Sequence, residues 1–280
     1  MSTTAQVAMK DGMSMPALGL GTWRMGERKS ARAVEIEALR LGLALGMHLV
    51  DTAEMYGDGG AEEVVGEAIA DQRAGVFLVS KVYPHHATRR GVVSACKRSL
   101  ARLRVRQLDL YLLHWRGDVP LADTVAGFES LRQDGMIRAW GVSNFGVDDM
   151  QELMSVQGGD RCAANQVLYH LGRRGIEFDL LPWCREHGVA VMAYSPVDQG
   201  RLCRNDALKR LAASQRTSAA QLAIAWLLAQ RGVAVIPKAS NAAHVRDNRA
   251  AADLRLDRAA LEAIDRAFPP PRRATPLAVL

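Results

Sequence analysis

Seven short apolar segments of this chain each stop at residues whose side chains can transfer protons or hold a ligand. The residues at these stops are Asp51, Lys81, His114, Ser143-Asn144, Asn165-Gln166, Tyr194 and Lys238. Segments this short and this continuously apolar are typical of parallel strands that are buried on both faces. A role in packing alone would scatter such side chains along the elements, so their recurrence at one end of each segment indicates a shared site.

Helical patterns alternate with these segments, and the composition does not break along the chain. We expect strands at residues 17–21, 48–50, 76–80, 108–113, 140–142, 163–164, 189–193 and 233–237. Apolar residues at helical spacing predict helices around 36–43, 92–103, 176–183 and 219–229. This alternation predicts an α/β fold, the (β/α)8 TIM barrel, as a single domain over residues 1–280. The carboxyl ends of all its strands open onto one face, where active sites are built.

Composition and charge exclude several other classes of protein. No apolar stretch approaches the roughly 18 residues that span a bilayer, and residues 1–12 lack the apolar core of a signal peptide, so we expect a cytoplasmic protein. The four cysteines lie far apart, which argues against a disulfide framework or a thiolate zinc site. The net charge of +6 indicates a solvated basic face that attracts small phosphate-bearing molecules rather than nucleic acid. We expect a monomer, with neither nucleic acid nor a membrane as a partner.

Asp51, Lys81 and His114, together with Tyr56, make a set suited to proton transfer. A phenol has an ordinary pKa of about 10, and a nearby cation such as Lys81 lowers it. An ammonium in a pocket needs a carboxylate partner, which Asp51 supplies. His114 adds a hydrogen bond to the reacting oxygen while charge builds on it. The set predicts protonation of an alkoxide as hydride arrives at a small carbonyl substrate, and the reverse reaction in oxidation.

Longer motifs around these residues resemble the signatures of the aldo-keto reductase family. They are Gly46-x-His48-x-x-Asp51-Thr52-Ala53-x-x-Tyr56, Leu108-Asp109-Leu110-Tyr111-Leu112-Leu113-His114, Ile236-Pro237-Lys238, Leu18-Gly19-Leu20-Gly21-Thr22-Trp23 and Gly141-Val142-Ser143-Asn144-Phe145. The match runs in order from about Ala17 to Asn248. The resemblance implies the barrel, an extended NADP(H), no metal, and a catalytic tetrad of Asp51, Tyr56, Lys81 and His114 with Tyr56 as the acid. The chain looks most like bacterial members that reduce methylglyoxal and other small aldehydes.

The resemblance also implies where the cofactor and the substrate lie. The nicotinamide carboxamide would be held by Ser143, Asn144 and Gln166, with Tyr194 stacked on the ring. The pyrophosphate would be lined by Ser195, Pro196, Val197, Gly200 and Arg201. The adenosine 2′-phosphate would lie at Lys238 and the start of the helix beyond Asn241, and the adenine at Asn248. Further cofactor contacts are expected at Gly21, Thr22, Trp23, Asp51, Ala239, Ser240 and His244, and the substrate pocket at Trp23, Tyr56, His114 and Trp115.

Three residues depart from the family pattern. His48 and His244 stand where most members carry arginine, and Ala239 stands where most carry serine. The changes at positions 239 and 244 weaken the expected grip on the 2′-phosphate. The sequence therefore defines the reaction more closely than it defines the choice between NADPH and NADH.

Two other functions compete with carbonyl reduction. A metal-dependent hydrolase on the same barrel needs His and carboxylate ligands, but residues 17–21 hold no His-x-His and the chain has no H-E-x-x-H. The adjacent His85 and His86 are interpreted as solvent-exposed rather than as ligands. A nucleotide-binding sensor with little turnover is the alternative function, against which the intact tetrad argues.

Overall fold

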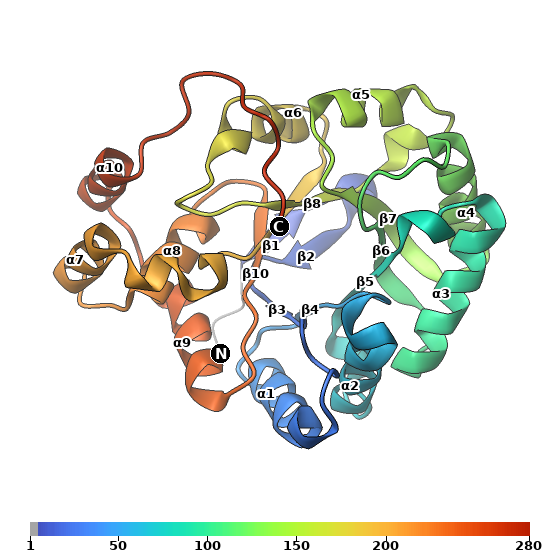
Figure 1. Ribbon diagram of the computed structural model, residues 1–280, viewed down its shortest axis with the longest axis horizontal. Coiled ribbons are helices and arrows are strands. Elements are labelled where there is room, and N and C mark those ends of the chain that lie inside the picture. The colour runs from blue at the N-terminus through green and yellow to red at the C-terminus, as the bar shows by residue number, and fades with distance from the viewer. Residues whose placement is uncertain (1–4) are drawn as a thin grey trace.

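Eight parallel strands close into a barrel in the computed structural model, which describes residues 5–280 apart from the side chain of residue 11 (Figure 1). The strands follow chain order around the barrel: β3 (Gly19–Gly21), β4 (Leu49–Asp51), β5 (Phe77–Val82), β6 (Leu108–Leu113), β7 (Ile137–Ser143), β8 (Ala164–Leu168), β9 (Ala190–Tyr194) and β10 (Val233–Ile236). The ring closes where Leu18 bridges Val235 and Gly21 bridges Lys238. The predicted (β/α)8 barrel is therefore confirmed.

Ten α-helices of the described chain surround the sheet (Figure 1). They are α1 (Arg32–Ala44), α2 (Gly60–Ala68), α3 (Arg89–Leu103), α4 (Leu121–Gln133), α5 (Val147–Ser155), α6 (Leu180–Glu186), α7 (Asp206–Ser214), α8 (Ala219–Leu228), α9 (Ala242–Ala250) and α10 (Arg258–Ala267). Large side chains such as Trp140 and Trp226 are completely buried between sheet and helices. In the part of the chain that is described, no helix is long and apolar enough to cross a membrane.

An antiparallel hairpin, which the sequence patterns do not predict, precedes the barrel. Its strands are β1 (Gln6–Ala8) and β2 (Ser14–Pro16). Met15 is completely buried in the apolar cluster that also contains Leu49 and Phe77, the first residues of β4 and β5. The hairpin therefore closes the amino end of the barrel, and the interior opens only at the carboxyl ends of the strands.

In five strands, β4, β5, β7, β8 and β9, the residue at which the apolar segment stops lies inside the strand. Lys81 lies inside β5, and Asn165 and Gln166 lie inside β8, although we expected the strands to stop before them. The ladder between β8 and β9 continues to Leu168, and the side-chain amide nitrogens of Asn165 and Gln166 donate hydrogen bonds within the protein. Asn165 Nδ2, for example, donates to the Phe145 carbonyl (2.8 Å), so Asn165 supports the loop after β7.

The expected helix over residues 176–183 is wrong. Ile176 lies in a short 3₁₀ turn (Gly175–Glu177), and α6 begins only at Leu180, where the Asp179 carboxylate accepts a hydrogen bond from the Leu180 N–H (2.6 Å). Trp183 is half-buried and stacks on His187 at 3.9 Å. Helical spacing of apolar residues fits two short elements as well as one longer helix.

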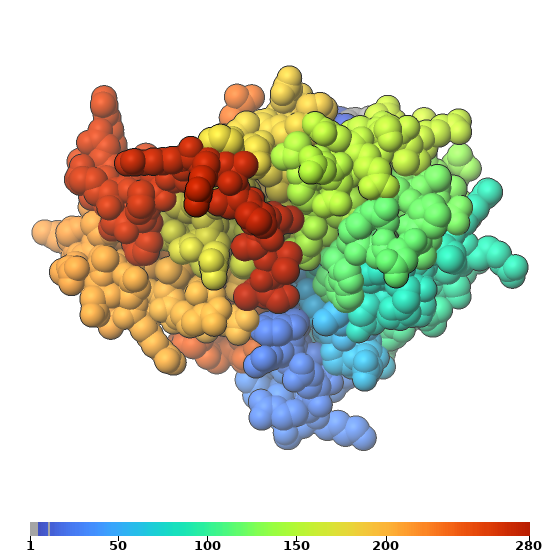
Figure 2. Space-filling model, turned by 45° about the horizontal axis from the view of Figure 1, so that its top comes forward, coloured from blue at the N-terminus to red at the C-terminus, as the bar shows by residue number. Residues whose placement is uncertain are grey.

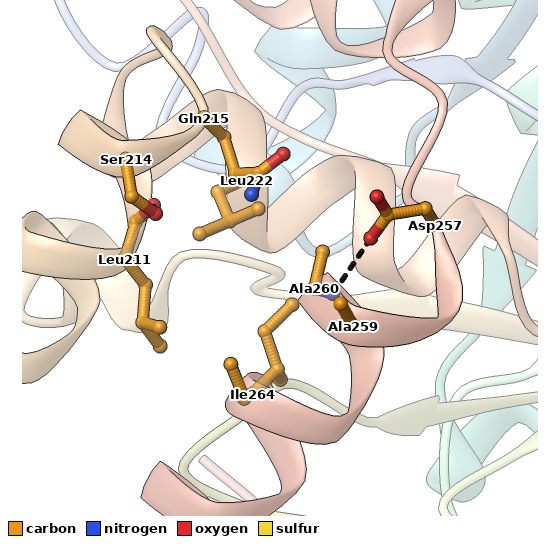
Figure 3. Close-up of a pocket in the computed structure, with 9 residues that line it drawn as sticks. Leu211, Ser214, Gln215, Leu222, Asp257, Ala259, Ala260 and Ile264 are labelled. Atoms are coloured by element: carbon orange, nitrogen blue, oxygen red, sulfur yellow. Dashed lines mark hydrogen bonds between the residues drawn. The ribbon is translucent and has the colours of Figure 1, made fainter.

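Two cavities lie outside the barrel interior. The smaller, of ≈ 160 Å³, lies between α7, α8 and α10 and is lined mainly by apolar side chains, among them Leu211, Leu222 and Ile264 (Figure 3). At its edge Asp257 caps α10 by accepting a hydrogen bond from the Ala260 N–H (2.8 Å). The larger, of ≈ 340 Å³, lies under residues 269–278, which cross the mouth of the barrel (Figure 2).

Candidate active site

Lys81 is the centre of a hydrogen-bond network at the carboxyl ends of β4 and β5. Its buried ammonium group donates to Asp51 Oδ2 (2.9 Å), to the Thr52 carbonyl (2.8 Å) and to the Tyr56 hydroxyl (3.2 Å). Asp51 is the last residue of β4, and Tyr56 begins the turn that follows. All three donors of the ammonium are thus engaged, which fixes it relative to the phenol.

Asp51 is held from two sides. Its Oδ1 accepts a hydrogen bond from Gln166 Nε2 (2.7 Å), and its backbone carbonyl accepts one from the Thr22 hydroxyl (2.9 Å). Because the Lys81 ammonium occupies Oδ2, both carboxylate oxygens have partners. This network joins residues of β4, β5 and β8 that are distant in the sequence.

Burial and charge shift the pKa values of this group. Burial opposes the ammonium, but Asp51 and Tyr56 outweigh it and raise the pKa of Lys81. Burial raises the pKa of Tyr56, and Lys81 lowers it by less than burial and Asp51 raise it. Lys81 lowers the pKa of Tyr56, as expected, but desolvation dominates and the net shift is upward. Tyr56 therefore stays protonated at neutral pH.

His114 follows β6 and lies beside the phenol. The rings of Tyr56 and His114 meet edge-on with centroids 5.6 Å apart. Burial, helped by the charge of Lys81, holds the pKa of His114 well below its usual range, so the imidazole is neutral. Its Nδ1 is buried and finds no hydrogen-bond partner within residues 5–280. A neutral imidazole can donate one hydrogen bond next to the proton of Tyr56.

Amide and hydroxyl groups from β7, β8 and β9 gather next to this group. The Tyr194 hydroxyl donates to Asn144 Oδ1 (2.9 Å), and Asn144 Nδ2 donates to Ser143 Oγ (3.3 Å) and to the His114 carbonyl (3.4 Å). Asn144 has a φ of 59°, a left-handed conformation that asparagine tolerates better than most residues. With Gln166 bonded to Asp51, the residues expected at a nicotinamide ring lie together.

The loop after β9 carries the residues expected at the pyrophosphate, from Ser195, Pro196 and Val197 to Gly200 and Arg201. Ser195 and Asp198 have φ values of 54° and 49°, and Gly200 has a φ of 88°. Arg201 donates to both carboxylate oxygens of Asp198, at 2.7 and 3.0 Å, and is exposed. The loop therefore presents a surface guanidinium that is held by a carboxylate of its own.

Polar and basic groups of the kind that suit a phosphate lie after β10. Lys238 is exposed and its Nζ lies 3.3 Å from Ser240 Oγ. His244 is exposed in the first turn of α9, where the capping Asn241 accepts a hydrogen bond from the His244 N–H (2.9 Å). An ammonium, an imidazole and a helix N-terminus in one place suit an anion. Two other residues predicted to contact the cofactor here, Ala239 and Asn248, are buried.

Further cations near Lys238 are not among the predicted site residues. Partial desolvation lowers the pKa of Lys238; the charges of Arg24 and Arg28 add to this effect, and those of Glu35 and Glu27 oppose it. Both follow the predicted contacts Gly21, Thr22 and Trp23. The sequence signal that could have indicated Arg24 and Arg28 is the run of basic residues after β3. A basic loop alone does not show which strand end it faces.

Aromatic side chains lie beside His114, whose ring centroid is 5.0 Å from that of Trp115. Trp23 and Trp115 are 38% and 37% exposed, as expected for walls of an open pocket. Tyr83, which we did not predict, packs edge-on against Trp115 with ring centroids 5.7 Å apart. Its signal was its position two residues after Lys81, because strand residues two apart share a face.

The expectation of a solvent-exposed histidine pair holds for His85 and is wrong for His86. His86 is half-buried, and its Nδ1 lies 2.9 Å from Oε1 of the buried Glu54. The same carboxylate oxygen accepts a hydrogen bond from the Tyr83 N–H (2.9 Å). A buried carboxylate requires such partners, which the sequence alone did not show.

Comparisons with known proteins bear on this arrangement. A sequence model of the Aldo/keto reductase family matches residues 17–268. The chain belongs to the aldo/keto reductase family. It is similar to methylglyoxal reductase YeaE of Escherichia coli (strain K12), with 52% identity over 95% of each chain. It is also similar to glyoxal reductase of Bacillus subtilis (strain 168), with 33% identity over 92% of this chain and 91% of that protein.

Solved structures of the aldo/keto reductase family have the same fold. An aldo/keto reductase from Klebsiella pneumoniae in complex with NADP and acetate has a TM-score of 0.96 and 48% identity, and covers 99% of this chain and 100% of its own. A structure from the same organism in complex with NADPH has a TM-score of 0.96 and 49% identity over all of both chains. The predicted family is thus confirmed, and the chain is an oxidoreductase of that family.

This aldo/keto reductase offers no ligand set for a metal within residues 5–280, where no group of three or more His, Cys, Asp or Glu side chains could hold an ion. We therefore predict that EDTA leaves carbonyl reduction unchanged, measured as the initial rate before and after dialysis. A zinc metalloprotease treated in the same way is the positive control for chelation. Loss of activity that one added divalent ion restores would contradict this prediction.

Proposed function

We propose that this protein reduces small aldehydes such as methylglyoxal to alcohols with NADPH, and that Tyr56 is the general acid. The observation that carries the proposal is the Tyr56 hydroxyl, which is 3.2 Å from the Lys81 ammonium and beside a neutral His114. Such a group suits proton donation to a carbonyl oxygen as negative charge develops on it. The names of the E. coli and B. subtilis relatives support the substrate class.

Each member of the tetrad then has a distinct task. Tyr56, kept protonated by burial, donates its proton to the carbonyl oxygen of the substrate. Lys81 stabilises the phenolate that remains, and Asp51 holds Lys81 in place through a 2.9 Å ion pair. His114 donates a hydrogen bond to the same substrate oxygen. The exposed Trp23 and Trp115 form the walls that admit a small substrate.

The cofactor is NADP(H), the group present in both Klebsiella structures. The donor set fits it: amides and hydroxyls beside the tetrad, a guanidinium along the loop after β9, and cations at the start of α9. When bound, it supplies the hydride. Ser143, Asn144 and Gln166 would orient the carboxamide, Tyr194 would support the ring, and Lys238 would hold the 2′-phosphate.

Initial rates with methylglyoxal, glyoxal, larger aldehydes and ketones, each with NADPH and NADH, test the proposal. We expect the highest kcat/KM for small aldehydes with NADPH. NADPH binding without turnover of any carbonyl would instead support the sensor, the alternative function.

His244 gives a prediction about cofactor choice. An imidazole is only partly protonated near neutral pH, whereas a guanidinium keeps its charge and can bind phosphate through two parallel bonds. His244→Arg should therefore tighten NADPH binding, within the ~1.5–3 kcal/mol of a charged hydrogen bond.

The measurement is the Kd of NADPH against pH for both proteins, with NADH as the control ligand. Titration of the 2′-phosphate itself is common to both proteins and cancels in their comparison. Equal NADPH affinity of the two proteins at every pH would show that His244 does not contact the phosphate.

A further inference from the structure

Residues 269–280, named here the strap, leave α10 and cross the mouth of the barrel (Figure 2). The strap covers a cavity of ≈ 340 Å³ whose floor includes Gly146, Leu168 and Gly175. It lies close to that floor, because a Cβ built on Gly175 would be 2.5 Å from Thr275 Oγ1. The segment is therefore seated on the residues that follow β7 and β8.

The far end of the strap reaches a predicted cofactor residue. Burial raises the pKa of Tyr194 to about 12, and the backbone of Leu280 lies close enough to moderate this rise. The Tyr194 hydroxyl in turn donates to Asn144 Oδ1 (2.9 Å). Figure 1 shows this end of the chain over the middle of the barrel. The strap therefore ends at the polar cluster next to Tyr56.

The near end of the strap is fixed by one guanidinium. Arg174 Nε and Nη2 donate to the two carboxylate oxygens of Glu177, both at 2.7 Å. Its Nη1 donates to Asp265 Oδ1 (2.7 Å) on α10 and to the carbonyl of Phe268, the residue before the strap. The Arg174 side chain is only 8% exposed. We call these four residues the Arg174 clamp.

The Arg174 clamp rests on a rigid base. The Arg174 guanidinium lies over the Trp226 ring, 4.9 Å from its centroid. The Tyr169 hydroxyl donates to Glu177 Oε1 (2.9 Å), and the Tyr169 ring packs against Trp226 at 5.4 Å. The clamp thus joins the turn after β8 to α8, to α10 and to the start of the strap. Bidentate charged hydrogen bonds are the strong kind, and lysine cannot reproduce them.

We infer that Arg174 is a positioning residue that holds the strap across the nicotinamide end of the site, and that the strap slows release of the cofactor. The placement of the nicotinamide rests on the proposed function. The strap ends at Tyr194, where the nicotinamide is proposed to bind, so the strap covers that end of the cofactor. When the clamp opens, the strap is no longer held there and the cofactor leaves faster. Arg174 itself lies outside the reacting group and acts only through residues 269–280.

Arg174→Gln, Arg174→Lys and the matched control Arg258→Gln test this role. Arg258 lies on α10, as does Asp265 of the clamp; its side chain is 93% exposed and pairs only with Glu262 among the described residues. The first readout is trypsin cleavage after the exposed Arg272 and Arg273, followed by mass spectrometry without cofactor. The second is the dissociation rate of NADPH in stopped-flow fluorescence.

We expect Arg174→Gln to raise both rates by about tenfold, since charged hydrogen bonds are lost. Arg174→Lys should give intermediate rates, and Arg258→Gln should match the wild type. A second variant that ends after Arg273 leaves the clamp intact and should also release NADPH faster, which guards against misfolding of the Arg174 variants. Wild-type rates of cleavage and release in Arg174→Gln, or wild-type release from the shortened chain, would overturn the inference. Faster NADPH release without carbonyl turnover by the wild type would overturn the proposed function and leave this inference standing.

Discussion

Tyr56→Phe is expected to lower kcat/KM for methylglyoxal by about 10²–10⁴-fold, the usual contribution of a general acid. The substitution removes only the hydroxyl that accepts the hydrogen bond from Lys81 Nζ (3.2 Å). The Kd of NADPH should stay near the wild-type value, because this hydroxyl faces the substrate in the proposed arrangement. Steady-state kinetics and a fluorescence titration of NADPH measure the two quantities.

Tyr111→Phe is the matched control. Tyr111 is completely buried on β6 and packs edge-on against Phe128, away from the tetrad. Its kinetics should remain close to those of the wild type, so a loss seen only in Tyr56→Phe reports on the reaction. Near wild-type turnover by Tyr56→Phe would mean that another group donates the proton.

Lys81→Met should cost both activity and stability. Asp51 would keep its hydrogen bond from Gln166 but lose the cation 2.9 Å from Oδ2. Removing one partner of a buried ion pair typically costs 3–5 kcal/mol, so the free energy of unfolding should fall by about that amount. Urea unfolding measures this change, and turnover should fall because the phenolate loses its stabilising charge.

Lys209→Met is the control for removing a lysine. Lys209 pairs with Asp206 at 3.3 Å, and both side chains are exposed, so its loss should change stability by less than about 0.5 kcal/mol. Equal stability of Lys81→Met and the wild type would show that the buried pair is not needed to hold Asp51. Unchanged turnover would remove Lys81 from the proposed mechanism.

The sequence predicted the barrel and the tetrad because both depend on local signals. The apolar segments ended near Asp51, Lys81 and His114, and closure of the sheet brings those ends together. The motif spacing also placed Tyr56 in the turn after β4, where its hydroxyl reaches Lys81. The residue roles themselves stay predictions until the variants are measured.

The missed features depend on contacts between distant segments. The net direction of the Tyr56 pKa shift depends on burial by the whole mouth, which no local pattern shows. The partner of His86 is Glu54, 32 positions earlier in the chain. Arg24 and Arg28 approach Lys238 only because the first and last strands of the barrel are neighbours. Spacing along the chain cannot report such pairs.

The closure of the sheet between Gly21 and Lys238 also concerns how the protein is made. The proposed cofactor site uses residues from the first strand of the barrel to the helix after the last, so no shorter fragment of the barrel contains it. During synthesis, a chain that still lacks β10 has no complete binding site for the dinucleotide. Binding of NADPH therefore reports that folding has finished, and the cofactor should stabilise the completed barrel against unfolding by an amount that grows with the logarithm of its concentration above the Kd.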